Sequence, residues 1–335
     1  MSLTTIDEAS KIATAPRAAS REELPVLDLG PLLRGESLDA LAKQLRHACE
    51  TTGFFYVANH GVPQKLVDDA FAATQRYFAL PEEKRLEMKL DDRFRRGFMP
   101  YGINQHPGFA PDLKESYEYA LDLPLTDPDV ARGLPLHGPN RWPADMPWLR
   151  EAAEAYFNAT MELGKHLLRL FAVSLGVEEG FFLQYLKKPM VQTRLFHYPP
   201  QPVARDAEFG VAPHSDYGMI TLLTQDPIGG LELRKRDGEW VAAPYIEGTF
   251  VVNLGDMFKV WTNDMYVSNL HRVVNRTGRE RYSIPTFFNL DYDAPVACLP
   301  GCQSAERPPK YKPIKSGDYL VSRFTTVQKL GTSVN

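Results

Sequence analysis

The 335-residue sequence has few cysteines, no long apolar run and no large excess of charge of one sign. Its three cysteines, Cys49, Cys298 and Cys302, cannot all pair, and no second Cys or His pair lies near the last two to complete a zinc site. No stretch reaches the roughly 18 consecutive apolar residues of a membrane span, and the first twenty residues lack the apolar core of a secretory signal. We therefore expect reduced thiols and a cytoplasmic protein that does not enter a membrane.

The charge balance argues against a nucleic-acid partner. There are 38 basic and 42 acidic side chains, which gives a net charge of −4. No basic cluster is denser than residues 93–96, so the chain lacks the positive surface that a phosphate backbone requires. With 44% apolar residues, the chain can bury a sizeable core. We expect a globular protein, a monomer or weak homodimer, whose partner is a small-molecule substrate.

The amino-terminal half reads as a mixture of helices and strands. A short strand is predicted at residues 23–29, followed by a helix at 38–52 and a second strand at 54–58. Residues 93–147 look like a long loop region, and loops of that length usually line a site. The clearest helical periodicity covers residues 148–177, which we expect to form a central packing helix.

After residue 190 the pattern changes to short apolar or alternating runs separated by turn signals. Asp237-Gly238 between two of the runs is typical of a hairpin turn. About eight short strands favour a jelly roll over a parallel sheet. The predicted fold class is therefore α+β, mainly β, with a cupin-like double-stranded β-helix core and flanking helices. The predicted strands are residues 192–198, 219–225, 231–234, 239–242, 249–254, 257–261, 271–275 and 282–289.

A possible metal site lies in this strand-rich half. Residues i and i+2 of a strand point to the same face, so His214 and Asp216 could converge on one ion, and His271 could complete the set. Two imidazoles and one carboxylate leave three adjacent positions of an octahedron open, the arrangement that holds non-haem Fe(II) for oxygen chemistry. The alternative is a chance H-x-D pattern with hydrogen-bonded histidines. His60 and His166 are expected to be structural, and His47, His106 and His137 have no partner at ligand spacing, so none of these is expected to bind a metal.

A second pair of residues suggests an anion site. Arg281 and Ser283 are expected to share one face of a strand, where a guanidinium and a hydroxyl suit a buried carboxylate. An arginine facing a barrel interior needs an anion, because an unpaired buried charge is costly. A structural salt bridge to an Asp or Glu is the alternative.

Taken in order, these motifs resemble the isopenicillin N synthase-like family of Fe(II)/2-oxoglutarate-dependent dioxygenases. The resemblance covers nearly the whole chain and includes Asp112–Glu115, which looks like a segment bordering the family's pocket. The further matching segments are residues 24–29 (LPVLDL), 53–63 (GFFYVANHGVP), 251–256 (VVNLGD) and 269–273 (NLHRV).

The resemblance implies roles for individual residues. His214, Asp216 and His271 match the Fe(II) ligands, Arg281 and Ser283 match the pair that binds the far carboxylate of 2-oxoglutarate, and Tyr198 matches a tyrosine that assists binding. One position departs from the plant-type pattern, which has asparagine where this chain has Phe196. Strand alternation places Arg194 on the same face as Phe196 and Tyr198. Arg194 offers either a charge to the pocket or an ion pair to a nearby acid. Further candidates for the substrate wall are Phe287, Arg95 and Met99, each of which could equally be a core residue or part of a solvated loop.

The implied activity couples decarboxylation of 2-oxoglutarate, with O2 as second co-substrate, to oxidation of a C–H bond in a small organic molecule. Succinate and CO2 are the expected products beside a hydroxylated, desaturated or cyclised substrate. One alternative keeps the iron without 2-oxoglutarate, as in isopenicillin N synthase, where Arg281 and Ser283 would bind another carboxylate. Another is a non-catalytic jelly roll that binds a metal or ligand.

These features predict five segments. Residues 1–20 would form a mobile tail, 21–145 an α/β segment, and 146–190 buttressing helices. Residues 191–300 would form the jelly-roll core with every predicted metal ligand, and 301–335 a carboxyl-terminal segment that could close over the site as a lid, in particular at residues 325–335.

Overall fold

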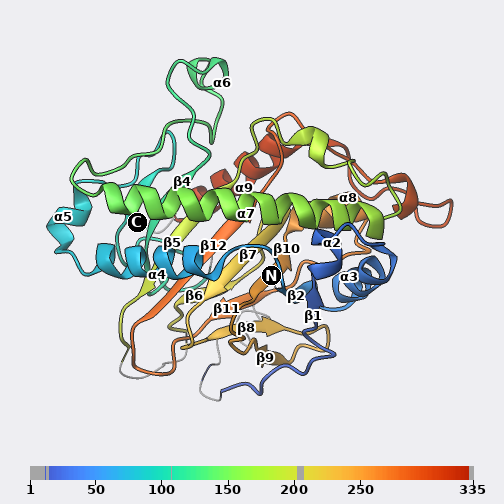
Figure 1. Ribbon diagram of the computed structural model, residues 1–335, viewed down its shortest axis with the longest axis horizontal. Helices are drawn as coiled ribbons and strands as arrows, with labels where there is room; N and C mark the ends of the chain where they lie inside the picture. The colour runs from blue at the N-terminus through green and yellow to red at the C-terminus, as the bar shows by residue number, and fades with distance from the viewer. Residues whose placement is uncertain (1–11, 13–14, 107, 202–206, 332–335) are drawn as a thin grey trace.

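Two β-sheets enclose the centre of the molecule (Figure 1). The computed structural model describes residue 12 and residues 15–106, 108–201 and 207–331, with side chains described as far as residue 324. Side chains from both sheets, among them Phe196, Tyr198, Leu233 and Val273, pack into one apolar cluster. This is the jelly-roll arrangement, and it confirms the fold class expected from the short strands.

The larger sheet has eight strands, and its middle is antiparallel. Only its first pair is parallel, where Leu27 lies opposite Val57. In spatial order the strands are β1 (Val26–Asp28), β2 (Phe54–Ala58), β10 (Phe250–Leu254), β7 (Ile220–Gln225), β12 (Arg281–Phe288), β5 (Gln192–Tyr198), β4 (Glu115–Ala120) and β3 (Gly97–Met99).

The smaller sheet has four antiparallel strands. Its first pair brings His271 directly opposite His214. In order, these strands are β6 (Val211–His214), β11 (His271–Val273), β8 (Leu231–Arg234) and β9 (Trp240–Ala242). A separate two-stranded sheet consists of β13 (Pro295–Val296) and β14 (Ile314–Lys315).

The two faces of strand β12 contact different parts of the molecule. Arg281, Ser283 and Phe287 line the cavity between the sheets, whereas the alternate residues face the helices. On the helical face of the sheet, the hydroxyl of Tyr156 in α7 lies 2.9 Å from the hydroxyl of Thr224 on the neighbouring strand β7. Gly164 leaves room for the ring of Phe288, because a Cβ there would lie only 2.0 Å from it. The period-2 pattern therefore separates the cavity-lining face of β12 from the face that packs against the helices.

The long helix α7 crosses the outer face of the larger sheet beside α4 (Figure 1). It covers Pro147–Ser174, close to the predicted range, with a proline in its first turn, where the missing N–H costs nothing. The other helices are α2 (Gly30–Leu33), α3 (Asp39–Thr51), α4 (Gln64–Phe78), α5 (Glu82–Leu86), α6 (Pro128–Ala131), α8 (Asp256–Thr262) and α9 (Ser316–Gly331), with 3-10 turns η1 (Leu183–Tyr185) and η2 (Pro300–Cys302). No helix in the described part of the chain is long and apolar enough to cross a membrane.

Two local predictions were wrong. Residues 257–261, predicted as a strand, lie in helix α8, which is followed by Asn263 in a left-handed conformation (φ 52°). Residues 93–147, predicted as loop, contain α6 and the strands β3 and β4. Strand β4 is buried along its whole length although it carries Glu115, Ser116 and Glu118. Because of these polar residues, the sequence pattern did not indicate a buried strand.

The ends of the chain bear on two further predictions. Most of the predicted tail lies outside the described residues, but Arg17 is placed and pairs with Glu23 and Glu239. Helix α9 carries Leu320 and Phe324, which line the cavity. The side chains of residues 325–331 and the whole of residues 332–335, where the lid was predicted, lie outside what the structure describes.

Candidate active site

Two histidines from adjacent strands form one side of the site. His214 ends β6 and His271 begins β11, so their ring centroids are 4.2 Å apart. The Nδ1 atom of His214 lies 2.8 Å from the carbonyl oxygen of Ala212, and that of His271 lies 3.3 Å from the carbonyl of Asn269. With a proton on each Nδ1, both Nε2 lone pairs are free for a metal. Burial also lowers the pKa of His214 well below its usual value, which favours the neutral, ligating imidazole.

Asp216 completes the cluster from the connection between the sheets. Strand β6 ends at His214, so the two residues do not share a strand as predicted, although their side chains do converge. Asp216 Oδ2 accepts hydrogen bonds from Thr221 Oγ1 (2.5 Å) and Asn253 Nδ2 (2.7 Å). Its other oxygen, Oδ1, lies 3.7 Å from His214 Nε2 and 3.8 Å from His271 Nε2. One oxygen is therefore held by the larger sheet, and the other faces the two imidazoles.

These three residues fit a metal ion. Their ligand atoms all lie within 4.8 Å of one another, and no other such group of three occurs among the described residues. A buried carboxylate oxygen that faces two imidazole lone pairs needs a cation to offset the repulsion between them. Two nitrogens and one oxygen suit non-haem Fe(II) and leave positions open for other ligands.

Arg281 lies in the same cavity on the opposite sheet. Its side chain is fully buried and lies over the ring of Tyr198, 4.5 Å from the centroid. It donates to three neutral oxygens: Ser283 Oγ at 3.2 Å, Gln225 Oε1 at 3.3 Å, and the Gly229 carbonyl. No carboxylate among the described residues forms an ion pair with it, so the structural salt bridge considered as an alternative is absent from this part of the chain. Burying a guanidinium without an anionic partner is energetically costly.

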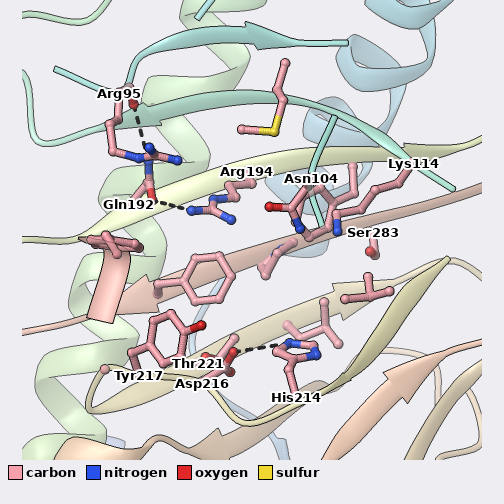
Figure 2. A pocket seen from close by; sticks show the side chains of 18 of the residues that line it. Arg95, Asn104, Lys114, Gln192, Arg194, His214, Asp216, Tyr217, Thr221 and Ser283 are labelled. Carbon is pink, nitrogen blue, oxygen red and sulfur yellow. Dashed lines mark hydrogen bonds and ion pairs between the residues drawn. The ribbon is translucent and has the colours of Figure 1, made fainter. Parts of the chain in front are cut away.

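The predicted substrate residues all line the same cavity, which has a volume of about 530 Å³. Arg194, Phe196 and Tyr198 project into it from β5. Phe287 comes from β12, and Arg95 and Met99 come from the region around β3. Figure 2 shows the Arg194 side chain across the cavity from His214 and Asp216. Their roles toward a substrate stay predictions.

His106 lines the cavity although no role was predicted for it from the sequence, and it lies beside Asp112 in the segment 112–115 that the resemblance placed at the border of the pocket. The ring of His106 stacks on that of His214, with centroids 4.7 Å apart. Burial lowers the pKa of His106 to about 4, so this ring is neutral. Asp112, which has no exposed surface, accepts from Lys114 Nζ at 2.5 Å and from the Ala212 amide at 2.9 Å. Asp112 thus ties the His106 loop to β6, a long-range contact that no local spacing indicates.

A jelly roll that brings two histidines and one carboxylate together, beside an arginine for which no ion pair occurs among the described residues, is typical of a metal-dependent oxygenase of the non-haem type. Comparison with known proteins agrees with this class. Residues 24–145 match the family described as non-haem dioxygenase in morphine synthesis N-terminal, and residues 186–290 match the 2OG-Fe(II) oxygenase superfamily. The 2-oxoglutarate-Fe(II) type oxidoreductase hxnY of Emericella nidulans is 38% identical over 88% of this chain and 88% of its own length. Kihadalactone A synthase of Citrus sinensis is 35% identical over 90% of this chain and 93% of its own length.

Solved structures with alpha-KG bound share the fold of this chain. A full-length Neurospora crassa protein in complex with alpha-KG superimposes with a TM-score of 0.81 at 30% identity, covering 93% of this chain and 99% of the N. crassa chain. The same protein with alpha-KG and thymine gives a TM-score of 0.79 at 31% identity, over 92% of this chain and 99% of the other. The chain belongs to the Fe(II)/2-oxoglutarate-dependent oxygenase superfamily. It is an oxidoreductase that uses Fe(II), 2-oxoglutarate and O2 and acts on a small molecule.

The hydrogen bonds to Asp216 Oδ2 give a first testable prediction. Replacing Thr221 by valine keeps the shape of the side chain but removes one of the two donors. We expect the affinity for Fe(II), or for Mn(II) as a redox-stable probe, to fall about 10- to 100-fold, because the carboxylate loses its fixed orientation. Anaerobic metal titration measures this, with Thr249→Val outside the cavity as control. Equal affinity in the Thr221 variant would show that Asn253 alone orients Asp216.

Proposed function

We propose that His214, Asp216 and His271 hold the iron, and that Arg281 and Ser283 bind the far carboxylate of 2-oxoglutarate. One observation carries the second assignment: Arg281 is fully buried in the cavity of the triad with only neutral hydrogen-bond acceptors among the described residues. A dicarboxylate that reaches from the metal to this guanidinium would neutralise it. Tyr198, whose ring lies against the guanidinium, would fix its orientation.

We further propose that the reaction oxidises an unactivated C–H bond of a small organic molecule. Bound Fe(II) supplies the oxidative decarboxylation of 2-oxoglutarate and the C–H oxidation. The chain supplies placement and exclusion of water. Phe196 and Phe287 give the cavity apolar walls, and Arg95, Met99 and Arg194 lie where they would contact a substrate. Thymine, present in one complex of the N. crassa protein, is an example of a molecule small enough for a cavity of about 530 Å³.

The proposal is tested by binding and then by turnover. Under anaerobic conditions the Mn(II)-loaded protein should bind 2-oxoglutarate, and the Fe(II)-loaded protein in air should then form succinate, faster when a substrate is added. Candidate metabolites can be screened for stimulated succinate release. An Fe(II)-loaded protein that never binds or consumes 2-oxoglutarate would contradict the assignment of Arg281 and favour a 2-oxoglutarate-independent oxidase.

The cytoplasmic location, the oligomeric state and the five-segment division stay predictions.

A further inference from the structure

Two arginines form a positively charged wall of the cavity away from Arg281. Arg194 projects from the middle of β5, and Arg95 comes from the turn before β3. Figure 2 shows both on the upper side of the cavity, with His214 and Asp216 on the lower side. We call Arg95 and Arg194 the arginine wall. Neither arginine belongs to the proposed iron ligands or to the proposed 2-oxoglutarate contacts, so these assignments do not account for the positive charge of the wall.

The arginine wall has one carboxylate for two guanidinium groups. Glu118 lies directly across from Arg194 in the β4–β5 pair and is 1% exposed. Its Oε2 is 3.4 Å from Arg194 Nε and also accepts a hydrogen bond from Gln192 Nε2 at 2.9 Å. Among the described residues no carboxylate pairs with Arg95, whose Nε is buried without a hydrogen-bond partner. The wall therefore keeps about one uncompensated positive charge, which is costly in a cavity unless an anion offsets it.

The contacts of Arg194 leave one edge of its guanidinium open. Its Nη2 donates to Gln192 Oε1 at 3.1 Å, and its flat face lies 4.9 Å from the centre of the Phe287 ring. No described residue accepts a hydrogen bond from Nη1. The side chain is only 17% exposed, so this donor faces the cavity and not bulk solvent. A planar guanidinium that is held on two sides and open on the third is suited to a carboxylate.

The backbone at Arg95 supports the same conclusion. Arg95 has a φ of 57°, a left-handed conformation that costs a side-chain-bearing residue about 1 kcal/mol or more. Two backbone hydrogen bonds, Asp91 N to Arg96 O (2.9 Å) and Arg95 N to Asp91 O (2.7 Å), hold this turn. The turn directs Arg95 to the cavity, where its guanidinium lies 5.4 Å from the ring centre of Phe324 on α9.

We propose that the arginine wall binds a carboxylate group of the primary substrate, so that the enzyme acts on small organic acids with a flat or apolar body. This inference rests on the proposed function. The carboxylate would bind Nη1 of Arg194 and the guanidinium of Arg95, which neutralises the wall. The apolar body would lie against Phe287 and Phe324, and the end opposite the carboxylate would reach the iron ligands. Substrate and 2-oxoglutarate then occupy separate anion sites on different walls and do not compete.

Matched acids and amides test the charge requirement directly. The probes are phenylacetate, 3-phenylpropanoate and cinnamate, each paired with its primary carboxamide, which has nearly the same shape without the charge. Binding to the Mn(II)- and 2-oxoglutarate-loaded protein is measured by anaerobic calorimetry. At least one acid is expected to bind about tenfold or more tightly than its amide. Acids that bind no better than their amides, or that do not bind at all, would overturn the proposal.

Variants locate the effect. Arg194→Gln and Arg95→Gln should each reduce the acid-over-amide ratio to near one, while the affinity for 2-oxoglutarate stays within about twofold of wild type. Two variants are used because Arg194→Gln leaves Glu118 without its cation and could fold poorly. Arg76→Gln is the control, since Arg76 is an exposed arginine that stacks on Trp148 outside the cavity.

The outcomes separate this inference from the proposed function. A wild-type protein that does not bind 2-oxoglutarate at all contradicts the role of Arg281. Normal 2-oxoglutarate binding with an unchanged acid-over-amide ratio in both variants contradicts the arginine wall alone. Competition between the acids and 2-oxoglutarate would also overturn it, because it would place both anions on Arg281.

Discussion

Replacing Asp216 by asparagine is expected to reduce succinate formation by about 10³-fold or more while the protein stays folded. The reason lies in how the two carboxylate oxygens are used. Oδ2 accepts from both Thr221 and Asn253, so the amide oxygen of the variant would take this place and keep both hydrogen bonds. The amide NH2 would then point to the two Nε2 atoms, where Oδ1 now lies at 3.7 and 3.8 Å. A donor group there replaces a ligand and repels a cation.

Metal-dependent stability distinguishes loss of the ligand from loss of the fold. Thermal unfolding of the wild type should shift upward as Mn(II) is added, because the ion binds the folded state. The Asp216→Asn protein should unfold at a similar temperature without metal and show no shift with it. Asp237→Asn, on the exposed Asp237-Gly238 hairpin, is the matched control and should behave as wild type. Normal succinate formation by the Asp216 variant would show that the triad is misassigned.

The sequence predicted most of the strands that build the site, because they alternate or form short apolar runs with clear turns. Residues 192–198 match β5, and residues 231–234 match β8. Helix α8 was mistaken for a strand because residues 257–261 (MFKVW), apolar except for Lys259, fit either structure, and periodicity cannot decide over so short a span. Strand β6 was missed because Val211–His214 is short, contains a proline and pairs only with β11 across a long separation in sequence.

The candidate site was predictable to the extent that its residues belong to local motifs. The triad and the Arg281–Ser283 pair are of this kind, and strand alternation correctly placed the pair on one face of β12. Residues that reach the site only through tertiary structure were not assigned to it from the sequence, although Asn253 lies in the matching segment 251–256. Asn253 and Thr221 hold Asp216 from β10 and β7, and Phe324 comes from the carboxyl-terminal helix. Register between strands distant in sequence brings them together, and single-sequence patterns do not contain that register.

Arg281→Met is expected to weaken 2-oxoglutarate binding by about 10²- to 10³-fold, because truncating one partner of a buried charge pair costs about 2–5 kcal/mol. Methionine has a similar length but no charge. Without 2-oxoglutarate, two effects on folding oppose each other. The variant no longer buries a cation, but Gly229 and Gln225 lose a donor, at a cost of about 1–3 kcal/mol for each group left unpaired. The net change in the free energy of unfolding is therefore expected to be small.

The dependence of stability on 2-oxoglutarate then isolates the role of Arg281. At a concentration 100 times its dissociation constant, 2-oxoglutarate stabilises the folded wild type by about 2.7 kcal/mol. At the same concentration, a variant with a 100-fold higher dissociation constant gains only about 0.4 kcal/mol. Anaerobic thermal unfolding of the Mn(II)-loaded proteins over a 2-oxoglutarate series measures both values, with Arg76→Met as control. An affinity within about threefold of wild type would mean that the carboxylate binds elsewhere, and the buried guanidinium would then require a different anion.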